Sequence, residues 1–297
     1  MPIGWMKAAT VQANKPKYSI ISLLKKKFAV TIEGRDRSVV HASDITKPNF
    51  CPRQWAFLDM SKVKALPEHH SLAMGVTYTM GLVTERVFIE DWLGSSAIGN
   101  WQCRRCGNQK TMCGKPLNGC GLSTDCLWMY NQMVVVDPAY NTSGAIDCII
   151  DLGAPLWVVT EIKTLNPDDF EKMVVPQPEH RLRTALYLKI LSTSVYKDKI
   201  NLLEARVIYI SRGYGKKNLQ WDEIMPFKEF VVERDDASIK DSLQKAKALK
   251  MFREEGVMPS GICATAIDKY AKNCTMCSAC FSGQYPAQFK WEVLVVE

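Results

Sequence analysis

Residues 144–164, GAIDCIIDLGAPLWVVTEIKT, form two apolar runs of strand length that are interrupted by charged side chains. The side chains of a strand point alternately to its two faces, so Glu161 and Lys163 share one face of the second run. Asp147 and Asp151 share a face of the first run for the same reason. The short connection GAPL predicts that the two strands form a hairpin. We therefore expect Asp147 and Glu161 to converge, with Lys163 beside them.

Two carboxylates at the end of a strand suit a hard divalent cation such as Mg²⁺ or Mn²⁺, which prefers oxygen ligands. Such an ion lowers the pKa of a bound water and stabilises the charge that grows on a phosphate. A lysine ammonium beside it can orient the water or neutralise an oxyanion. The alternative is an edge-strand aspartate and an exposed Glu–Lys pair. The charges interrupt runs that otherwise look buried, which favours the metal site.

The wider pattern predicts helices and strands of a globular α/β chain with 47% hydrophobic residues. Strands are expected at 133–137, 145–152, 157–164, 203–211 and 227–233. Helices are expected to begin near Ser43 or Asp44, to run over 71–93 up to Gly94, to follow Pro178, and to run over 237–255 up to Gly256. This order predicts a mixed sheet with helices on its faces.

The sequence GAID, followed after a hairpin by EIK, resembles the PD-(D/E)XK nucleases. Within them, roughly residues 41–285 are similar to the RecB-type exonucleases, a group that includes CRISPR-adaptation nucleases and phage relatives. The resemblance implies a restriction-endonuclease-like mixed central sheet flanked by helices. It also implies that Asp147, Glu161 and the Ile162 carbonyl hold Mg²⁺ or Mn²⁺. Lys163 would position the attacking water.

Two further motifs of that family have counterparts here. In GLVTERVFIEDWL, where the family has a metal-binding His or Glu on a helix, Glu85 is the candidate third ligand and Glu90 and Asp91 are the alternatives. The family's Gln-x-x-x-Tyr corresponds to Arg183 and Tyr187, which share a helix face one turn apart. Tyr187 matches the pattern and Arg183 departs from it. Both are expected to face the phosphate backbone, where an arginine can hold a phosphate.

The eleven cysteines form clusters with CxxC spacing, and the chain shows no secretory signal, so metal ligation is favoured over disulfides. NFCPRQW and NCTMCSACF resemble the iron–sulfur signature of the same nucleases. The resemblance implies a [4Fe–4S] cluster that joins the N- and C-terminal regions through Cys51, Cys274, Cys277 and Cys280. Cys263 is a rival for one of these positions. A local zinc site of Cys263 with the three downstream cysteines is the alternative.

A third cluster, CRRCGNQKTMCGKPLNGCG, lies in residues 100–128 and predicts a zinc ribbon inserted as an irregular, metal-held loop. Its CxxCG element forms a tight turn around a metal, and a loop with so little apolar content would need the metal to fold. The expected ligands are Cys103, Cys106, Cys113 and Cys120, with Cys126 as a rival. Cys148, next to Asp147, is expected to be a plain core thiol.

Residues 1–40 form a basic leader with eight basic and two acidic side chains, in a chain of net charge +7. Contact with nucleic-acid phosphates, for example through Lys25, Lys26 and Lys27, is one interpretation, and a solvated tail is the other. Residues 41–297 would form the nuclease domain, with 100–128 as the zinc-binding insertion and 261–285 as the iron–sulfur segment.

Together these features predict a metal-dependent DNA exonuclease that hydrolyses phosphodiester bonds in single-stranded DNA or at DNA ends. Partner proteins would come from recombination, replication or DNA repair. A structure-specific endonuclease and a nucleic-acid-binding scaffold without catalysis are the alternatives. No apolar run approaches the roughly 20 residues of a spanning helix, so no membrane is expected. We expect a cytoplasmic protein, in the host cytoplasm if it is viral.

Overall fold

The computed structural model describes residues 38–60, 72–116, 126–213 and 225–282. The leader lies outside this part of the chain except for residues 38–40, and so do Lys25, Lys26, Lys27 and Cys120. None of the described helices is long and apolar enough to cross a membrane.

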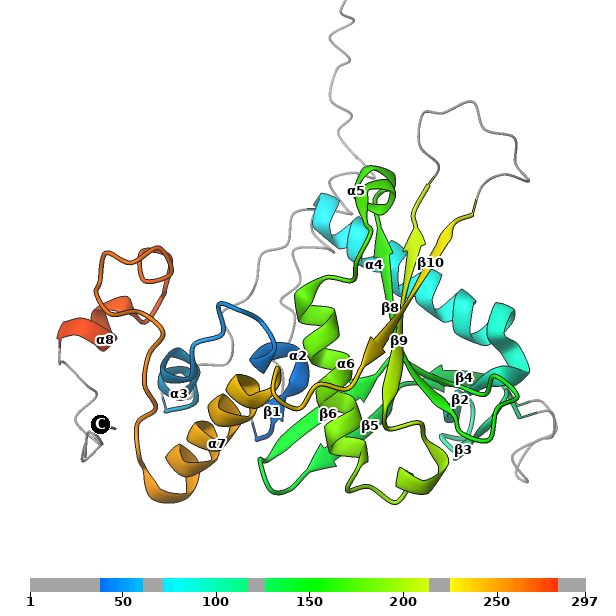
Figure 1. Ribbon diagram of the computed structural model, residues 1–297, viewed down its shortest axis with the longest axis horizontal. Coiled ribbons are helices and arrows are strands. Elements are labelled where there is room, and N and C mark those ends of the chain that lie inside the picture. Colours follow the sequence, from blue (N-terminus) through cyan, green and yellow to red (C-terminus); the bar gives the residue numbers. More distant parts are fainter. Residues whose placement is uncertain (1–37, 61–71, 117–125, 214–224, 283–297) are drawn as a thin grey trace, which may run out of the picture.

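The strands form two sheets, and both mix parallel and antiparallel pairs (Figure 1). The larger sheet has the order β10 (Phe227–Glu233), β9 (Glu204–Ser211), β8 (Val158–Leu165), β7 (Cys148–Ile150), β2 (Ala97–Cys103) and β3 (Gln109–Cys113). In it β4 (Trp128–Asn131) also pairs with β2. The smaller sheet has the order β1 (Val40–His41), β6 (Thr142–Ile146) and β5 (Met133–Asp137). The predicted mixed α/β architecture is confirmed.

The strand expected at 145–152 is not continuous in the structure. It breaks at Asp147 into β6 and β7, which belong to different sheets. The preceding chain breaks in the same way at Gln132, between β4 in the large sheet and β5 in the small one. Because Met133 pairs with Ile146, the two breaks lie opposite each other. The predicted hairpin is confirmed in β7 and β8, which are antiparallel, with Cys148 opposite Thr160.

Residues 100–128 also differ from expectation. They do not form an irregular insertion throughout, because residues 97–103, 109–113 and 128–131 are the strands β2, β3 and β4 of the large sheet. Strand β2 is almost wholly buried, and Trp101 at its middle is fully covered. The sequence predicts a loop because glycine, asparagine and cysteine interrupt its short apolar stretches. Whether such a segment forms a strand depends more on pairing with neighbouring strands than on its own residue preferences.

The helices cover both faces of the large sheet (Figure 1). They are α2 (Ala42–Ile45), α3 (Pro52–Met60), α4 (Leu72–Val87), α5 (Pro167–Lys172), α6 (Pro178–Leu191), α7 (Lys240–Glu255) and α8 (Cys277–Ser282). A π-helical stretch (Phe88–Leu93) and a 3₁₀ turn (Gly94–Ser96) continue α4, and a further 3₁₀ turn (Lys197–Lys199) precedes β9. Helix α7 ends as predicted at Gly256, whose φ of 76° suits a left-handed cap.

Strand β8 separates the two cores. Its residue Val159 belongs to the main core, which also contains buried leucines and isoleucines of α6 and α7. Ile162, which points to the opposite face, belongs to a second core with Phe88 and Ile89 of the π-helical stretch. Helix α4 approaches this second face so closely that a Cβ on Gly81 would lie 3.2 Å from Thr164 Oγ1. Glu161 and Lys163 share the face of Val159, on which α6 packs.

Candidate active site

Asp147 is buried at the break between β6 and β7, and protein donors hold both of its carboxylate oxygens. Oδ2 accepts hydrogen bonds from the backbone N–H of Ile162 and from Lys163 Nζ, each at 2.9 Å. Oδ1 accepts from Gln132 Nε2, also at 2.9 Å. Because the strand switches sheets at this residue, its side chain turns toward β8. The convergence expected from the sequence is therefore present in the structure.

Glu161 is fully buried on β8 and meets two cations at one oxygen. Its Oε1 lies 2.6 Å from Lys163 Nζ and 2.6 Å from Arg183 Nη1. Its Oε2 is buried and has no hydrogen-bond partner among the described residues. An unpartnered buried carboxylate oxygen costs free energy. This oxygen therefore remains available to a ligand.

Three oxygen atoms surround Lys163 Nζ. They are Asp147 Oδ2 at 2.9 Å, Glu161 Oε1 at 2.6 Å and the Ile162 carbonyl at 2.8 Å. These are the three groups that the sequence suggested as ligands of a divalent cation, and the lysine ammonium stands at their centre. Burial lowers the pKa of Lys163, but the two carboxylates outweigh this and raise it above its usual value. An all-oxygen set with one unpartnered carboxylate oxygen fits the chemistry of Mg²⁺ or Mn²⁺.

Glu85 on α4 is linked to Asp147 by the side chain of Gln132. The Nε2 of Gln132 donates to Glu85 Oε1 at 3.1 Å as well as to Asp147. Burial, and then the charge of Asp147, raises the pKa of Glu85 to about 7. Burial and the charge of Glu161 raise the pKa of Asp147 in the same direction. Gln132 was not found from the sequence, although a lone polar residue between two strand-like runs could have suggested it.

The alternatives to Glu85 have other positions. Glu90 accepts a hydrogen bond from the backbone N–H of Tyr130 at 2.9 Å, so it connects the π-helical stretch to β4. Asp91 is exposed. Of the three acidic residues considered on this segment, Glu85 is the one linked by a shared hydrogen-bond donor to Asp147.

Tyr187 is buried, and this differs from the expected contact with a phosphate backbone. Its hydroxyl donates to the Ala145 carbonyl at 2.8 Å, and its ring covers Gly144, where a Cβ would lie 2.6 Å from Cε1. The tyrosine therefore fixes β6 immediately before Asp147. Arg183, one turn earlier on α6, is turned toward Glu161. Its side chain is only 12% exposed.

His180 begins the same face of α6 and completes the surroundings of the carboxylates. Its Nδ1 lies 2.8 Å from the hydroxyl of Tyr209, and the residue is buried. Burial, followed by the positive charges of Lys163 and Arg183, lowers the pKa of His180 to about 3. The imidazole is therefore neutral at ordinary pH.

Five thiols line one cavity of about 400 Å³ between the start of α3 and the region of α8. They are Cys51, Cys263, Cys274, Cys277 and Cys280, which is the set considered for the iron–sulfur cluster together with its rival. All five are half-buried. Burial, and then the neighbouring Cys51, raises the pKa of the Cys280 thiol to about 11. The structure thus brings the two ends of the described chain together at the cysteines.

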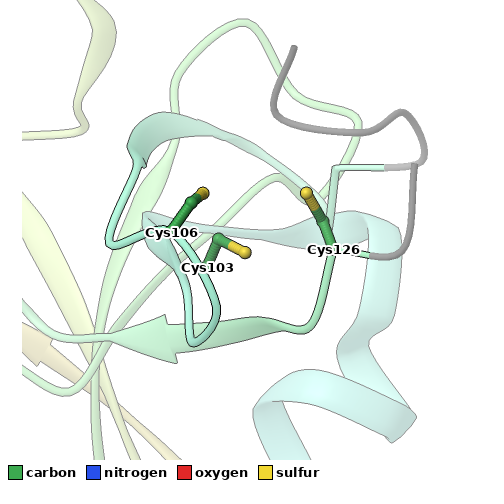
Figure 2. A group of neighbouring side chains, drawn as sticks. All are labelled: Cys103, Cys106 and Cys126. Carbon is green, nitrogen blue, oxygen red and sulfur yellow. The ribbon is translucent and has the colours of Figure 1, made fainter. Parts of the chain in front are cut away.

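The sulfurs of the cysteine cluster in residues 100–128 lie closer together. Among the residues that the structure describes, the sulfurs of Cys103, Cys106 and Cys126 lie within 4.8 Å of one another (Figure 2). Cys113 is not with them, because it pairs with Ile98 and its Sγ donates to the Ser95 carbonyl at 3.0 Å. Cys148 is fully buried in the second core, where a plain core thiol was expected.

The comparisons with known proteins add little to this geometry. No family model and no curated protein matches the chain. Among solved structures, the crystal structure of SSO0001 is 15% identical, with 80% of this chain and 87% of that chain covered and a TM-score of 0.37. An alkaline exonuclease (LHK-Exo) from Laribacter hongkongensis is 14% identical, with 72% and 86% covered and a TM-score of 0.39. The same enzyme in complex with dAMP is 16% identical, with the same coverage and a TM-score of 0.36. TM-scores at this level are too low to assign a family.

Proposed function

We propose that this protein is a metal-dependent nuclease that hydrolyses phosphodiester bonds in DNA. One observation carries the proposal. Asp147, Glu161 and the Ile162 carbonyl direct three oxygens at one point 2.6–2.9 Å away, which the Lys163 ammonium occupies. Two buried carboxylates aimed at a single cation position, with a third carboxylate linked to them, form a set of ligands for Mg²⁺ or Mn²⁺.

Each residue of the site has a role in this proposal. Asp147 and Glu161 hold the divalent ion with the Ile162 carbonyl, and Glu85 completes the carboxylate set. The bound ion would supply an activated water and would neutralise charge on the phosphate. Lys163 gives up the central position and donates hydrogen bonds to the attacking water or to a phosphate oxygen. Tyr187 acts on the site only by fixing β6.

Gln132 and Arg183 support the carboxylates rather than the substrate. The amide of Gln132 donates to Glu85 and to Asp147, so it reduces the repulsion between two like charges. Arg183 holds Glu161 Oε1 at 2.6 Å and fixes the orientation of that carboxylate. Such outer contacts commonly change metal affinity or activity by about 10–100-fold.

A specific observation favours a second candidate function. Glu161 Oε1 already has two cationic partners at 2.6 Å, so its charge is compensated by protein groups alone. A nucleic-acid-binding scaffold that does not cleave its ligand would need nothing more. In that case the carboxylates would serve only to anchor Lys163 and Arg183.

The finer parts of the proposal concern substrate and cofactors. The substrate would be single-stranded DNA or a DNA end, approached with help from the basic leader of residues 1–40. A [4Fe–4S] cluster would be held by Cys51, Cys274, Cys277 and Cys280, with Cys263 as a fifth thiol in reach. No three of these five described thiols have sulfurs within 4.8 Å of one another.

Cleavage of linear and circular DNA tests the proposal. End-labelled single strands and a closed single-stranded circle are incubated with the wild-type chain and with Mg²⁺ or Mn²⁺. Loss of the linear strand with an intact circle is the expected result. Cleavage of the circle would instead show an endonuclease. No metal-dependent cleavage of either substrate, with retained binding, would show the scaffold.

A further inference from the structure

We propose that Cys103, Cys106 and Cys126 bind one zinc ion that fastens the end of β2 to the start of β4. This site is separate from the proposed nuclease centre. The sequence alone favoured Cys113 over Cys126, and the strand pairing reverses that choice. Cys103 ends β2 and pairs with Trp128 of β4. Cys113 pairs with Ile98, five residues earlier on β2, which is roughly 17 Å along a strand.

The backbone around Cys103 has the form of a metal-binding turn. Gly107 has a φ of 72°, which suits glycine, and its N–H donates to the Cys103 carbonyl at 2.9 Å. The N–H of Cys103 donates to the Asn108 carbonyl at 2.8 Å. These two hydrogen bonds close a tight turn that carries both Cys103 and Cys106.

The third thiol, Cys126, belongs to the segment that leads into β4. The N–H of Arg104 donates to the Leu127 carbonyl at 2.9 Å, and this bond holds Cys126 opposite the turn (Figure 2). The three sulfurs lie within 4.8 Å of one another. This separation is close to the 3.8 Å or so that tetrahedral zinc requires, so only a small adjustment is needed. It is too small for a cluster of several iron atoms.

Plain apolar packing accounts poorly for this group. The surrounding cluster contains Trp101 and Trp128 as its large buried side chains, and Tyr130 is only partly buried. Cys106 and Cys126 are half-exposed, whereas a structural core thiol is usually covered. A metal that links the three thiols would add a cross-link to this corner beyond the packing of the two tryptophans.

The zinc site also bears on the proposed nuclease centre, and this step rests on the proposed function. Strand β4 begins two residues after Cys126 and ends at Asn131, next to Gln132. Gln132 is the residue that links Glu85 and Asp147. A zinc ion that fixes β4 on β2 therefore limits how far Gln132 can move.

Metal content and cobalt spectra of the full-length protein test the zinc site without reference to cleavage. Cys126→Ser and Cys103→Ser are compared with Cys113→Ser, a matched control in the same cysteine-rich segment. We expect each of the first two variants to contain one zinc equivalent less than the wild type, and Cys113→Ser to retain it. With Co²⁺ in place of zinc, the sulfur-to-cobalt absorption should be lost in the same two variants. Zinc loss in Cys113→Ser with retention in Cys126→Ser would overturn the assignment.

A second measurement needs no variant. The wild-type chain is alkylated with and without prior removal of metal by a chelator, and the modified cysteines are identified by mass spectrometry. Cys103, Cys106 and Cys126 should be protected until the chelator is added, whereas the exposed Cys113 should react in both samples. Equal reactivity of all four, or a disulfide among the three, would refute zinc binding. Zinc protection without cleavage of any DNA would leave this site intact and refute only the nuclease.

Discussion

The carboxylate site and the thiol cavity of Cys51 are organised in different ways. At the carboxylate site, Glu161 and Lys163 lie on β8, and Asp147 directly precedes its partner strand β7. Lys163 contacts the two carboxylates at 2.6–2.9 Å. The cavity is lined by residues at the start of α3 and by residues before and within α8. In Figure 1 these two helices lie on the far side of α7 from the large sheet. At this cavity the backbone N–H of Gln54 donates to Cys51 Sγ, with 3.5 Å between the nitrogen and the sulfur.

The two regions differ in what holds their side chains in position. The sheet and its charge pairs hold the carboxylates in place before any metal binds. The cavity joins two distant chain segments, so the proposed iron–sulfur cluster would supply much of its order. Removing charge from the first site should therefore affect chemistry more than folding. Removing a thiol from the second should affect folding.

The largest expected effect is the loss of cleavage in Asp147→Asn. Initial rates should fall on the order of 10³-fold, as for other losses of a charged group that acts in the transition state. The free energy of unfolding should rise, because burial and Glu161 make the charge of Asp147 unfavourable in the folded state. Urea unfolding of metal-free protein measures this. An inactive variant that is also less stable would mean that the sheet does not hold the site on its own.

The second prediction concerns Cys51→Ser. The protein should lose its bound iron and its broad absorption near ~400 nm, which comes from thiolate-to-iron charge transfer. A loss of 2 kcal/mol in stability would lower the unfolding temperature by about 4–8 °C. The exposed thiol variant Cys113→Ser is the control, and Cys263→Ser tests the fifth thiol. If Cys51→Ser is as stable as the wild type, the contrast between the two regions fails.

The third prediction, Gln132→Met, tests how far hydrogen bonds inside the carboxylate site hold the carboxylates in place. It removes both hydrogen bonds while keeping a side chain of similar size. Mn²⁺ affinity, measured by titration without DNA, should fall about 10-fold, and excess Mn²⁺ should restore part of the activity. Asn131→Ala is the matched control, because its amide donates instead to Gln102 Oε1 at 2.9 Å. Equal Mn²⁺ affinity in wild type and Gln132→Met would show that the Gln132 amide does not help to position the carboxylates.

The fourth prediction concerns pH and His180. Its pKa is lowered from 6.5 to about 3 in the folded protein. Between these values the unfolded state binds the proton and the folded state does not, so stability falls as pH falls through this window. At pH 5 the loss is about 2 kcal/mol, from 1.36 kcal/mol per pH unit. His180→Gln keeps a partner for Tyr209 and should lack this loss, measured as the difference in unfolding free energy between the two proteins from pH 7 to pH 5.

Much of the carboxylate site could be predicted because it depends on local rules. Alternation along the strand and a four-residue connection place Asp147, Glu161 and Lys163 together. Glu85 needed the family resemblance in addition. Gln132 was missed, because it enters the site where the chain changes sheets at one residue. The mark that this break leaves in the sequence is a single polar residue between two strand-like runs.

The thiols show the same limit. The spacing of Cys103 and Cys106 predicts a metal-binding turn on its own. The choice between Cys113 and Cys126 depends on which residues of β3 and β4 pair with β2, and this register is set by the whole sheet. Tyr187 was placed correctly on its helix, but its direction depended on the small size of Gly144 on β6.

The position of Lys163 has a consequence for the order in which the protein is assembled. Because the ammonium compensates Asp147 and Glu161, the newly made chain can complete its sheet in the absence of any divalent ion. In the proposed nuclease, a divalent ion would enter late and in exchange for the lysine. The thiols of the Cys51 cavity come from two distant chain segments, so the proposed iron–sulfur cluster would have to form while those segments meet. A cell that lacks iron would then accumulate chains with a complete carboxylate site and unjoined ends.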